Sequence, residues 1–115
     1  MNLIIDIGNT LTKVCIFSKD KIEYFQQYQT GNSIALKELF LSFNKIDCSI
    51  ISAVAELPDE MISVIGKNVK HTFILDINTT LPVRNLYKTP ETLGKDRIAA
   101  IAGAYNIFPG KNVLV

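Results

Sequence analysis

The sequence predicts an α/β fold in which helices cover a mixed β-sheet. Residues 3–7 form an apolar run broken only by Asp6, which is typical of a central strand covered on both faces. Two further strand-like segments follow after short turns, and the hydrophobic period then changes to that of a helix. We therefore expect the order strand, strand, strand, helix, strand, helix, strand.

The first three strands are expected to form a meander. Residues 11–17 regain strand character after three turn-type residues, and Lys19-Asp20 marks a second turn. In the segment "KIEYFQQY" that follows, Ile22, Tyr24 and Tyr28 lie at alternating positions, as on one face of a strand.

Two helix–strand units follow. Apolar residues between Ser33 and Phe43 are spaced for one helical face, with Ser33 as the expected N-cap. Residues 48–54 and 71–75 are expected strands, and residues 58–65 form a short helix with Pro58 near its first turn.

The sequence pattern of residues 76–115 predicts a loop, a helix and a strand. Residues 76–90 lack periodicity, "TLGKDRIAAIAGAYNIF" has helical spacing that ends at Pro109-Gly110, and "KNVLV" resembles the opening of a buried strand cut short. This is the order of one ribonuclease H-like lobe and the start of a second. We expect a lobe over 1–76, a connecting loop over 77–91, and the helix and first strand of an incomplete second lobe over 92–115.

Composition excludes several classes of protein. The 115 residues are 48% hydrophobic, which is typical of a globular domain. The net charge of +1 is too small to attract nucleic acid or an anionic membrane electrostatically. No apolar run approaches the roughly 18 residues of a membrane span, so a cytoplasmic location is expected. Cys15 and Cys48 are expected as buried free thiols and His71 as an ordinary strand residue.

The turn Gly8-Asn9-Thr10 is the first candidate site. A hairpin after a central strand can present backbone N–H groups to a phosphate, Gly8 allows a close approach, and Lys13 adds positive charge. A carboxylate at Asp6 beside such a loop indicates Mg²⁺ held through water on a nucleotide phosphate. The alternative is an Asn-centred turn in which Asp6 is only a local hydrogen-bond acceptor.

The segment "YKTPETLGKDR", residues 87–97, is the second candidate site. A helix start offers unpaired N–H groups and partial positive charge to an anionic or polar substrate, and Asp96 can act as general base towards a hydroxyl. The alternative is an acid that favours the helix dipole beside a solvated Lys95 and Arg97.

Together the two segments resemble one family. "DIGNTLTK" at residues 6–13 is similar to the first phosphate-binding motif of type III pantothenate kinases, and "YKTPETLGKDR" resembles that family's pantothenate and catalytic segment. The family belongs to the acetate kinase, sugar kinase, Hsp70 and actin superfamily, whose duplicated ribonuclease H-like lobes match the predicted order of elements.

The resemblance implies ATP-dependent phosphorylation of pantothenate to 4′-phosphopantothenate, the first step of coenzyme A synthesis. It also implies Mg²⁺, a monovalent cation (K⁺ or NH₄⁺) and a homodimer. Asp96 would be the proton acceptor. The residues implied to bind ATP phosphates and their metal are Asp6, Ile7, Gly8, Asn9, Thr10, Leu11, Thr12 and Lys13. Those implied to hold pantothenate are Tyr87, Gly94, Lys95, Asp96 and Arg97.

One departure from the family concerns the end of the sequence. In the family, the strand resembling "NVLV" leads into a second motif, Asp-x-Gly-Thr, whose Asp is associated with the monovalent cation and whose Thr contacts ATP. We expect that motif, with the adenine contacts and much of the dimer interface, to lie beyond Val115. The 115 residues alone are then expected to be inactive.

Two other functions remain open. The first motif is shared in outline with sugar kinase-like and exopolyphosphatase-like members of the superfamily, although residues 94–97 argue against these. The other is a noncatalytic nucleotide-binding regulatory module. The near-neutral charge and the absence of a DNA-binding motif argue against direct binding of such a module to DNA.

Overall fold

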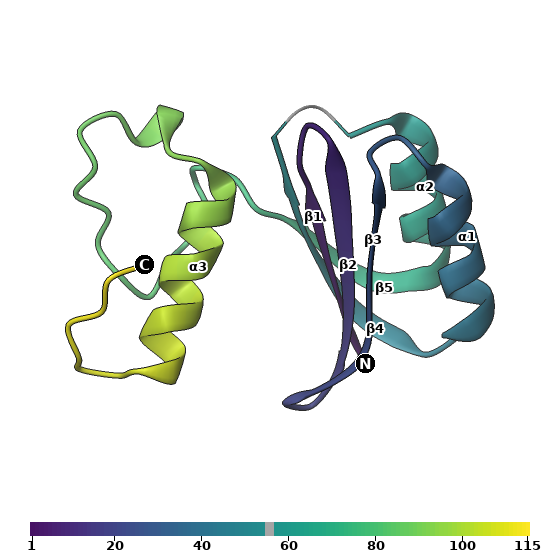
Figure 1. Cartoon of the computed structure of the whole chain (residues 1–115), viewed down its shortest axis with the longest axis horizontal. Helices are drawn as coiled ribbons and strands as arrows, with labels where there is room; N and C mark the ends of the chain where they lie inside the picture. Colours follow the sequence, from purple (N-terminus) through teal and green to yellow (C-terminus); the bar gives the residue numbers. More distant parts are fainter. Residues whose placement is uncertain (55–56) are drawn as a thin grey trace. The chain divides into compact units, whose positions relative to one another are not determined.

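Five strands in the described residues form one mixed sheet (Figure 1). The computed structural model describes residues 1–54 and 57–115, which divide into two compact units, Met1–Ile74 and Leu75–Val115. The sheet belongs to the first unit, with strand order β3-β2-β1-β4-β5. Its strands are β1 (Asn2–Ile7), β2 (Leu11–Ser18), β3 (Lys21–Gln29), β4 (Ile46–Ala53) and β5 (Val69–Ile74).

The helices α1 (Ser33–Ser42) and α2 (Asp59–Asn68) are the crossovers of the sheet. β1, β2 and β3 pair antiparallel, whereas β4 pairs parallel with β1 and β5 pairs parallel with β4. Parallel neighbours need a crossover connection, and right-handed crossovers in one direction place both helices on the same face. Figure 1 shows α1 and α2 together on one face of the sheet. The predicted order of elements is confirmed.

The hydrophobic core lies between that face and the two helices. Leu3, Ile5 and Ile7 of β1 are buried and alternate with the half-buried Ile4 and Asp6. The helices contribute these buried residues: Leu36, Leu39, Phe40, Met61 and Ile65. Among the described residues of Met1–Ile74, the helices α1 and α2 lie on this one face, and the expectation that β1 is covered on both faces stays a prediction.

The cysteines lie on the less covered face and are half-buried rather than buried. Cys15 of β2 stands opposite Ile4 of β1, and Cys48 of β4 stands opposite Asn2. Both are free thiols, and partial burial raises the pKa of the Cys15 thiol. The expectation of buried thiols is wrong, because both side chains lie on the sheet face opposite to α1 and α2 and are only partly buried there.

The N-cap of α1 is Asn32 rather than the predicted Ser33. The Asn32 side-chain oxygen accepts a hydrogen bond from the Ala35 N–H at 3.4 Å, and Ser33 is the first helical residue. Gly31 precedes the cap with a φ of +93°, which favours glycine, and turns the chain from β3 into the helix.

Leu36 should be a principal source of stability in the first unit. It is 1% exposed in the core, whereas Leu41 of the same helix is 86% exposed. We expect Leu36→Ala to lower the free energy of unfolding by about 2–5 kcal/mol, because it removes buried methyl groups and leaves a cavity. Leu41→Ala is the matched control and should change it by less than about 0.5 kcal/mol in urea denaturation.

The hydroxyl of Tyr28 is buried and has no hydrogen-bond partner among residues 1–54 and 57–115. Burial, followed by the charge of Tyr24, raises the pKa of Tyr28 to about 12. The folded state therefore keeps its proton above pH 10, the ordinary pKa at which the unfolded chain loses it. Stability linked to this group is complete below pH 10 and is lost as the pH rises towards 12.

Tyr28→Phe should remove that alkaline loss. At pH 7 we expect the variant to unfold at the wild-type urea concentration or slightly above it, because no hydrogen bond is broken. At pH 11 the variant should be the more stable protein. Tyr105→Phe, at a half-exposed tyrosine of the second unit, is the control and should leave the difference between the two pH values unchanged. An equal alkaline loss in wild type and Tyr28→Phe would contradict this account.

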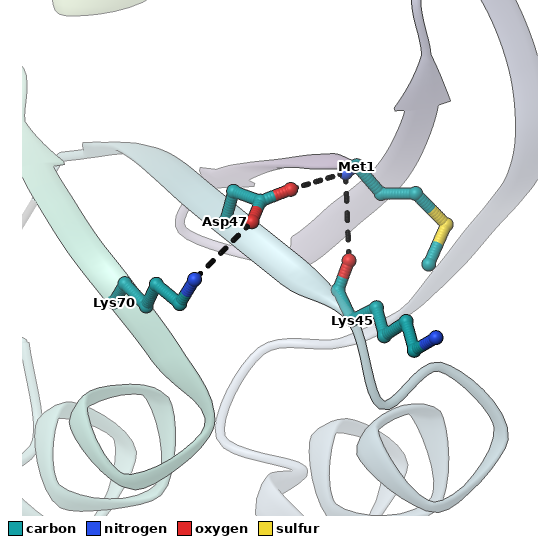
Figure 2. A network of polar contacts seen from close by, with 4 residues as sticks. All are labelled: Met1, Lys45, Asp47 and Lys70. Atoms are coloured by element: carbon teal, nitrogen blue, oxygen red, sulfur yellow. Dashed lines mark hydrogen bonds and ion pairs between the residues drawn. The ribbon is translucent and has the colours of Figure 1, made fainter.

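Polar contacts join the starts of three parallel strands (Figure 2). The amino group of Met1 donates to Oδ2 of Asp47 at 2.8 Å and to the Lys45 carbonyl at 3.4 Å. Nζ of Lys70 lies 3.8 Å from Oδ1 of Asp47. The hydrogen bond and charge of the amino group, then Lys70, lower the pKa of Asp47. These contacts support the register of β1, β4 and β5 at the end of the sheet away from Gly8.

The second unit contains a loop, a 3₁₀ turn (η1, Pro90–Thr92) and α3 (Lys95–Ile107). α3 ends two residues before Pro109, and the Phe108 N–H bonds to the Ala104 carbonyl at 2.9 Å. The predicted strand over 111–115 is not formed in the described structure, since a strand requires a neighbouring strand for its backbone groups. The division at residues 77 and 92 stays a prediction.

No helix in residues 1–54 and 57–115 has the length and apolar character needed to cross a membrane.

Candidate functional site

The loop Gly8–Thr10 makes a tight connection between β1 and β2. The Gly8 N–H donates to the Leu11 carbonyl at 3.0 Å, which closes the turn. A Cβ added at Gly8 would lie 3.0 Å from that same oxygen, which is tighter than nine in ten real Cβ contacts. Glycine therefore fits where a larger residue would require the Leu11 carbonyl to shift.

Thr30, directly after β3, fastens this loop from outside. Its N–H donates to the Thr10 carbonyl at 3.0 Å and its hydroxyl donates to the Gly8 carbonyl at 2.9 Å. The same hydroxyl lies 3.1 Å from the hydroxyl of Thr12, which is fully buried. Sequence reasoning missed Thr30, because the only signal was its position in the turn that follows a strand. Thr12, predicted as a phosphate ligand, serves this internal network.

The amides of Asn9 and Thr10 form the open part of the loop. Within the described residues neither N–H donates to a backbone carbonyl, and both residues are exposed. Backbone N–H groups at such a turn attract anions. Ile7 and Leu11 can add only backbone, since the Ile7 side chain is in the core and the Leu11 side chain is apolar. The loop thus has the geometry of a small anion-binding turn.

Asp6 and Lys13 are direct cross-strand neighbours beside this loop. Nζ of Lys13 lies 3.7 Å from Oδ2 of Asp6, and the two side chains are 53% and 35% exposed. An ion pair this exposed contributes at most about 1 kcal/mol, so Lys13 can leave Asp6 for an incoming anion. Ser52 of β4 stands on the other side of Asp6 in the sheet.

Asp6 is not part of a cluster of metal-binding side chains among the described residues. Among residues 1–54 and 57–115, no three His, Cys, Asp or Glu side chains gather where they could hold a metal ion. Mg²⁺ at nucleotide sites is commonly held by one or two carboxylates, waters and substrate phosphates. A single carboxylate beside an anion-binding turn fits that mode of binding.

The second set of predicted residues lies at the start of α3. The Gly94 carbonyl accepts hydrogen bonds from the N–H groups of Arg97 and Ile98, at 3.1 and 3.2 Å. The carboxylate of Asp96 folds back over Gly94 and fills the space that a Cβ there would need. Asp96 and Arg97 are exposed, and Lys95 is half-buried. Gly94 is therefore the residue that allows this placement of the Asp96 carboxylate.

Tyr87 lies at the edge of a cavity of about 250 Å³ in the same unit. Its N–H donates to Oδ1 of Asn85 at 2.9 Å, which fixes the chain before the ring. The cavity is lined by Leu81, Arg84, Asn85, Leu86, Tyr87, Leu93, Ile98 and Ile101. Sequence reasoning missed Arg84 and Asn85, because they lie in an aperiodic loop without a motif.

The two sets of predicted residues lie in different units of the structure. Asp6 to Lys13 surround one turn of the unit Met1–Ile74, whereas Tyr87 and Gly94 to Arg97 belong to the unit Leu75–Val115. The first set can bind an anion with an accompanying cation. The second offers a carboxylate at a helix start, in the unit that also contains the cavity lined by Tyr87.

A protein-family model described as type III pantothenate kinase matches residues 2–115. The chain belongs to this family. The type III pantothenate kinase of Bacteroides fragilis strain YCH46 is 40% identical over 115 residues, which cover 100% of this chain and 47% of that protein. The type III pantothenate kinase of Christiangramia forsetii is 39% identical over 116 residues, with the same two coverages. The chain spans about half the length of the curated type III pantothenate kinases it matches.

A solved structure agrees with the fold. A Bacteroides thetaiotaomicron protein with an actin-like ATPase fold and unknown function superposes with a TM-score of 0.52 and 8% identity, over 87% of this chain and 37% of that chain. This member of the type III pantothenate kinase family therefore has the predicted actin-like α/β fold.

Proposed function

We propose that the chain is the phosphate-binding and substrate-binding portion of a pantothenate kinase, which transfers the γ-phosphate of ATP to pantothenate. The observation that carries the proposal is the family match over residues 2–115, a range that includes both motifs. The loop beside Asp6 and the helix start at Asp96 supply the two kinds of group that phosphoryl transfer needs.

The loop Gly8–Thr10 would bind ATP phosphate through the amides of Asn9 and Thr10. Lys13 would move from Asp6 to the phosphate, and Asp6 would then accept hydrogen bonds from water on Mg²⁺. The half-exposed ion pair at 3.7 Å supports this exchange, because little stability is lost when it opens. Mg²⁺ would neutralise charge that develops on the transferring group.

The start of α3 would present Asp96 to the primary hydroxyl of pantothenate. Its carboxylate would orient the hydroxyl and take its proton late in a loose transition state, so that positioning supplies most of the rate. Tyr87, Gly94, Lys95 and Arg97 would hold the rest of the substrate. The exposed position of Asp96 over Gly94 supports access by a ligand.

A complete enzyme would use parts beyond these residues. The relatives are about twice as long as this chain, which covers 47% of their length. We assign the K⁺ or NH₄⁺ ligand, the adenine contacts and a homodimer interface to that additional length. The 115 residues alone are then inactive as a kinase.

The test is a fusion protein: residues 1–115 followed by the part of the Bacteroides fragilis relative that lies beyond the matched region. ATP consumption coupled to NADH oxidation is measured with MgATP, K⁺ and pantothenate. We expect pantothenate-dependent turnover by the fusion protein and by the intact relative, and none by residues 1–115.

The controls separate the possible causes of failure. Circular dichroism and gel filtration establish that the fusion protein folds, and omission of pantothenate establishes that turnover depends on it. A folded fusion protein that binds ATP without pantothenate-dependent turnover would reject the kinase assignment. Turnover by residues 1–115 at the rate of the fusion protein would reject the assignment of essential groups to the additional length.

A further inference from the structure

A row of polar side chains crosses the sheet beside the loop Gly8–Thr10. Asp6 of β1 stands opposite Lys13 of β2 on one side and opposite Ser52 of β4 on the other. Directly opposite residues in a sheet share a face, so these side chains lie on the face opposite to α1 and α2 (Figure 1). The register therefore places one hydroxyl group directly beside the Asp6 carboxylate.

This pair lies at the carboxyl ends of two parallel strands. One pair nearer to the strand starts on the same face, Ile4 of β1 stands opposite Ile50 of β4, so the face changes from apolar to polar at Asp6 and Ser52. The pairing continues beyond them, because the Val54 N–H donates to the Ile7 carbonyl at 3.1 Å. Ligands of open α/β sheets bind outside the carboxyl ends of the strands. Ser52 is thus fixed at the end of the sheet where a ligand is expected.

The two serines near the middle and end of β4 differ in their surroundings. Ser49 is buried, and its hydroxyl donates to the Thr72 hydroxyl of β5 at 2.8 Å. Ser52 is half-buried, and among residues 1–54 and 57–115 its hydroxyl has no hydrogen-bond partner. Because neighbouring strands lie about 4.8 Å apart, the short side chains of Ser52 and Asp6 are within reach of one another. Ser49 therefore has a structural contact, whereas Ser52 offers a donor to Asp6.

We propose that Ser52 is a positioning residue of the nucleotide site, whose hydroxyl donates a hydrogen bond to the Asp6 carboxylate when Lys13 moves to the phosphate. The inference rests on the proposed function, in which Lys13 makes that move and Asp6 accepts hydrogen bonds from water on Mg²⁺. Before the move, Nζ of Lys13 lies 3.7 Å from Oδ2 of Asp6. Afterwards, a hydrogen bond from β4 holds the carboxylate in one orientation, as the partners of metal-binding carboxylates do.

A neutral donor suits this role. The hydroxyl of Ser52 orients Asp6 without neutralising it, so the negative charge that attracts the metal ion is kept. A second cation beside Asp6 would compete with Mg²⁺ for the same carboxylate. Lys13 and Ser52 thus have different tasks on the two sides of Asp6, the first in the absence of nucleotide and the second in its presence.

The test compares ATP binding with and without Mg²⁺ in the 115-residue chain. NMR titrations follow the amide signals of Asn9 and Thr10 with MgATP and, separately, with ATP in EDTA. Ser52→Ala should raise the Kd for MgATP about tenfold and leave the Kd for ATP in EDTA unchanged, because Asp6 acts only through the metal ion. Ser52→Thr keeps the hydroxyl and should bind as wild type. Ser18→Ala, at a half-buried serine of β2, is the control and should also bind as wild type.

A double variant shows whether Ser52 acts through Asp6. In the Asp6→Asn background, Ser52→Ala should cause no further loss of MgATP binding, since the carboxylate that Ser52 orients is already absent. Ser52→Cys keeps the size of the side chain but donates weakly, so it should behave as Ser52→Ala. Circular dichroism checks the fold of each variant, and Ser52→Cys supplies the comparison if Ser52→Ala does not fold.

The outcomes separate this inference from the proposed function. Equal Kd values for MgATP in wild type and Ser52→Ala would overturn the inference and leave the proposed function, which the fusion protein tests, intact. A loss that is as large in EDTA or in Asp6→Asn would also overturn it, as would the unfolding of both Ser52 variants, because Ser52 would then act on the fold. If MgATP up to about 10 mM shifts neither the Asn9 nor the Thr10 amide in wild type, the proposed phosphate loop is rejected, and this inference with it.

Discussion

Asp96→Asn in the fusion protein should lower kcat by about 10²- to 10⁴-fold, the range that general-base catalysis contributes. The amide keeps the size of the side chain over Gly94 but cannot accept a proton from the pantothenate hydroxyl. KM for pantothenate should change little, since an amide can still hydrogen-bond the hydroxyl. Steady-state kinetics with pantothenate varied at saturating MgATP measure both constants.

Glu91→Gln is the matched control for Asp96. Glu91 is an exposed acid in the 3₁₀ turn Pro90–Thr92, just before α3, so its substitution removes the same charge from the same unit. We expect wild-type kcat and KM. Unchanged turnover in Asp96→Asn would remove Asp96 from its catalytic role without affecting the family assignment.

Asp6→Asn should raise the KM for MgATP by about ten- to a hundredfold. A hydrogen bond to a charged group contributes about 1.5–3 kcal/mol, and the amide would lose the charge that attracts the hydrated metal ion. The Mg²⁺ concentration that gives half-maximal rate should rise as well. Coupled assays that vary ATP and Mg²⁺ independently measure the two effects.

Stability should hardly change in this variant. The pair of Asp6 with Lys13 is half-exposed, so its loss costs at most about 1 kcal/mol in the free energy of unfolding. Asp20→Asn, in the exposed turn between β2 and β3, is the control and should bind MgATP normally. A wild-type Mg²⁺ dependence in Asp6→Asn would show that the metal ion is held without this carboxylate.

The order of strands and helices was predictable because the spacing of apolar residues along the sequence differs between strands and helices. The alternation in β2 and the helical spacing from Ser33 determine which residues face the core. The partial exposure of Ile4 was not predictable, because an apolar residue within a strand-like run is expected to be buried. The prediction of a strand over 111–115 is wrong, because an apolar segment forms a strand only when another strand lies beside it.

The candidate site was predictable only where it forms a short motif. Asp6, Gly8 and Lys13 stand close in sequence and meet at one turn. Thr30 joins Gly8 through a hydrogen bond across 22 positions, and no local pattern specifies such a contact. The positions of Arg84 and Asn85 beside the cavity lined by Tyr87 were also not predictable, because the folding of the chain and not a sequence motif brings them there.

The hydrogen bonds of Thr30 also set the order in which the chain can complete the loop Gly8–Thr10. During synthesis, residues 8–10 leave the ribosome early, but their carbonyls remain without the Thr30 partner until β3 has emerged and paired. The loop is thus encoded near the start of the chain and completed only after the whole meander has folded. A nascent chain that ends within β2 contains the motif and Leu11, which closes the turn, but lacks the hydrogen bonds from Thr30.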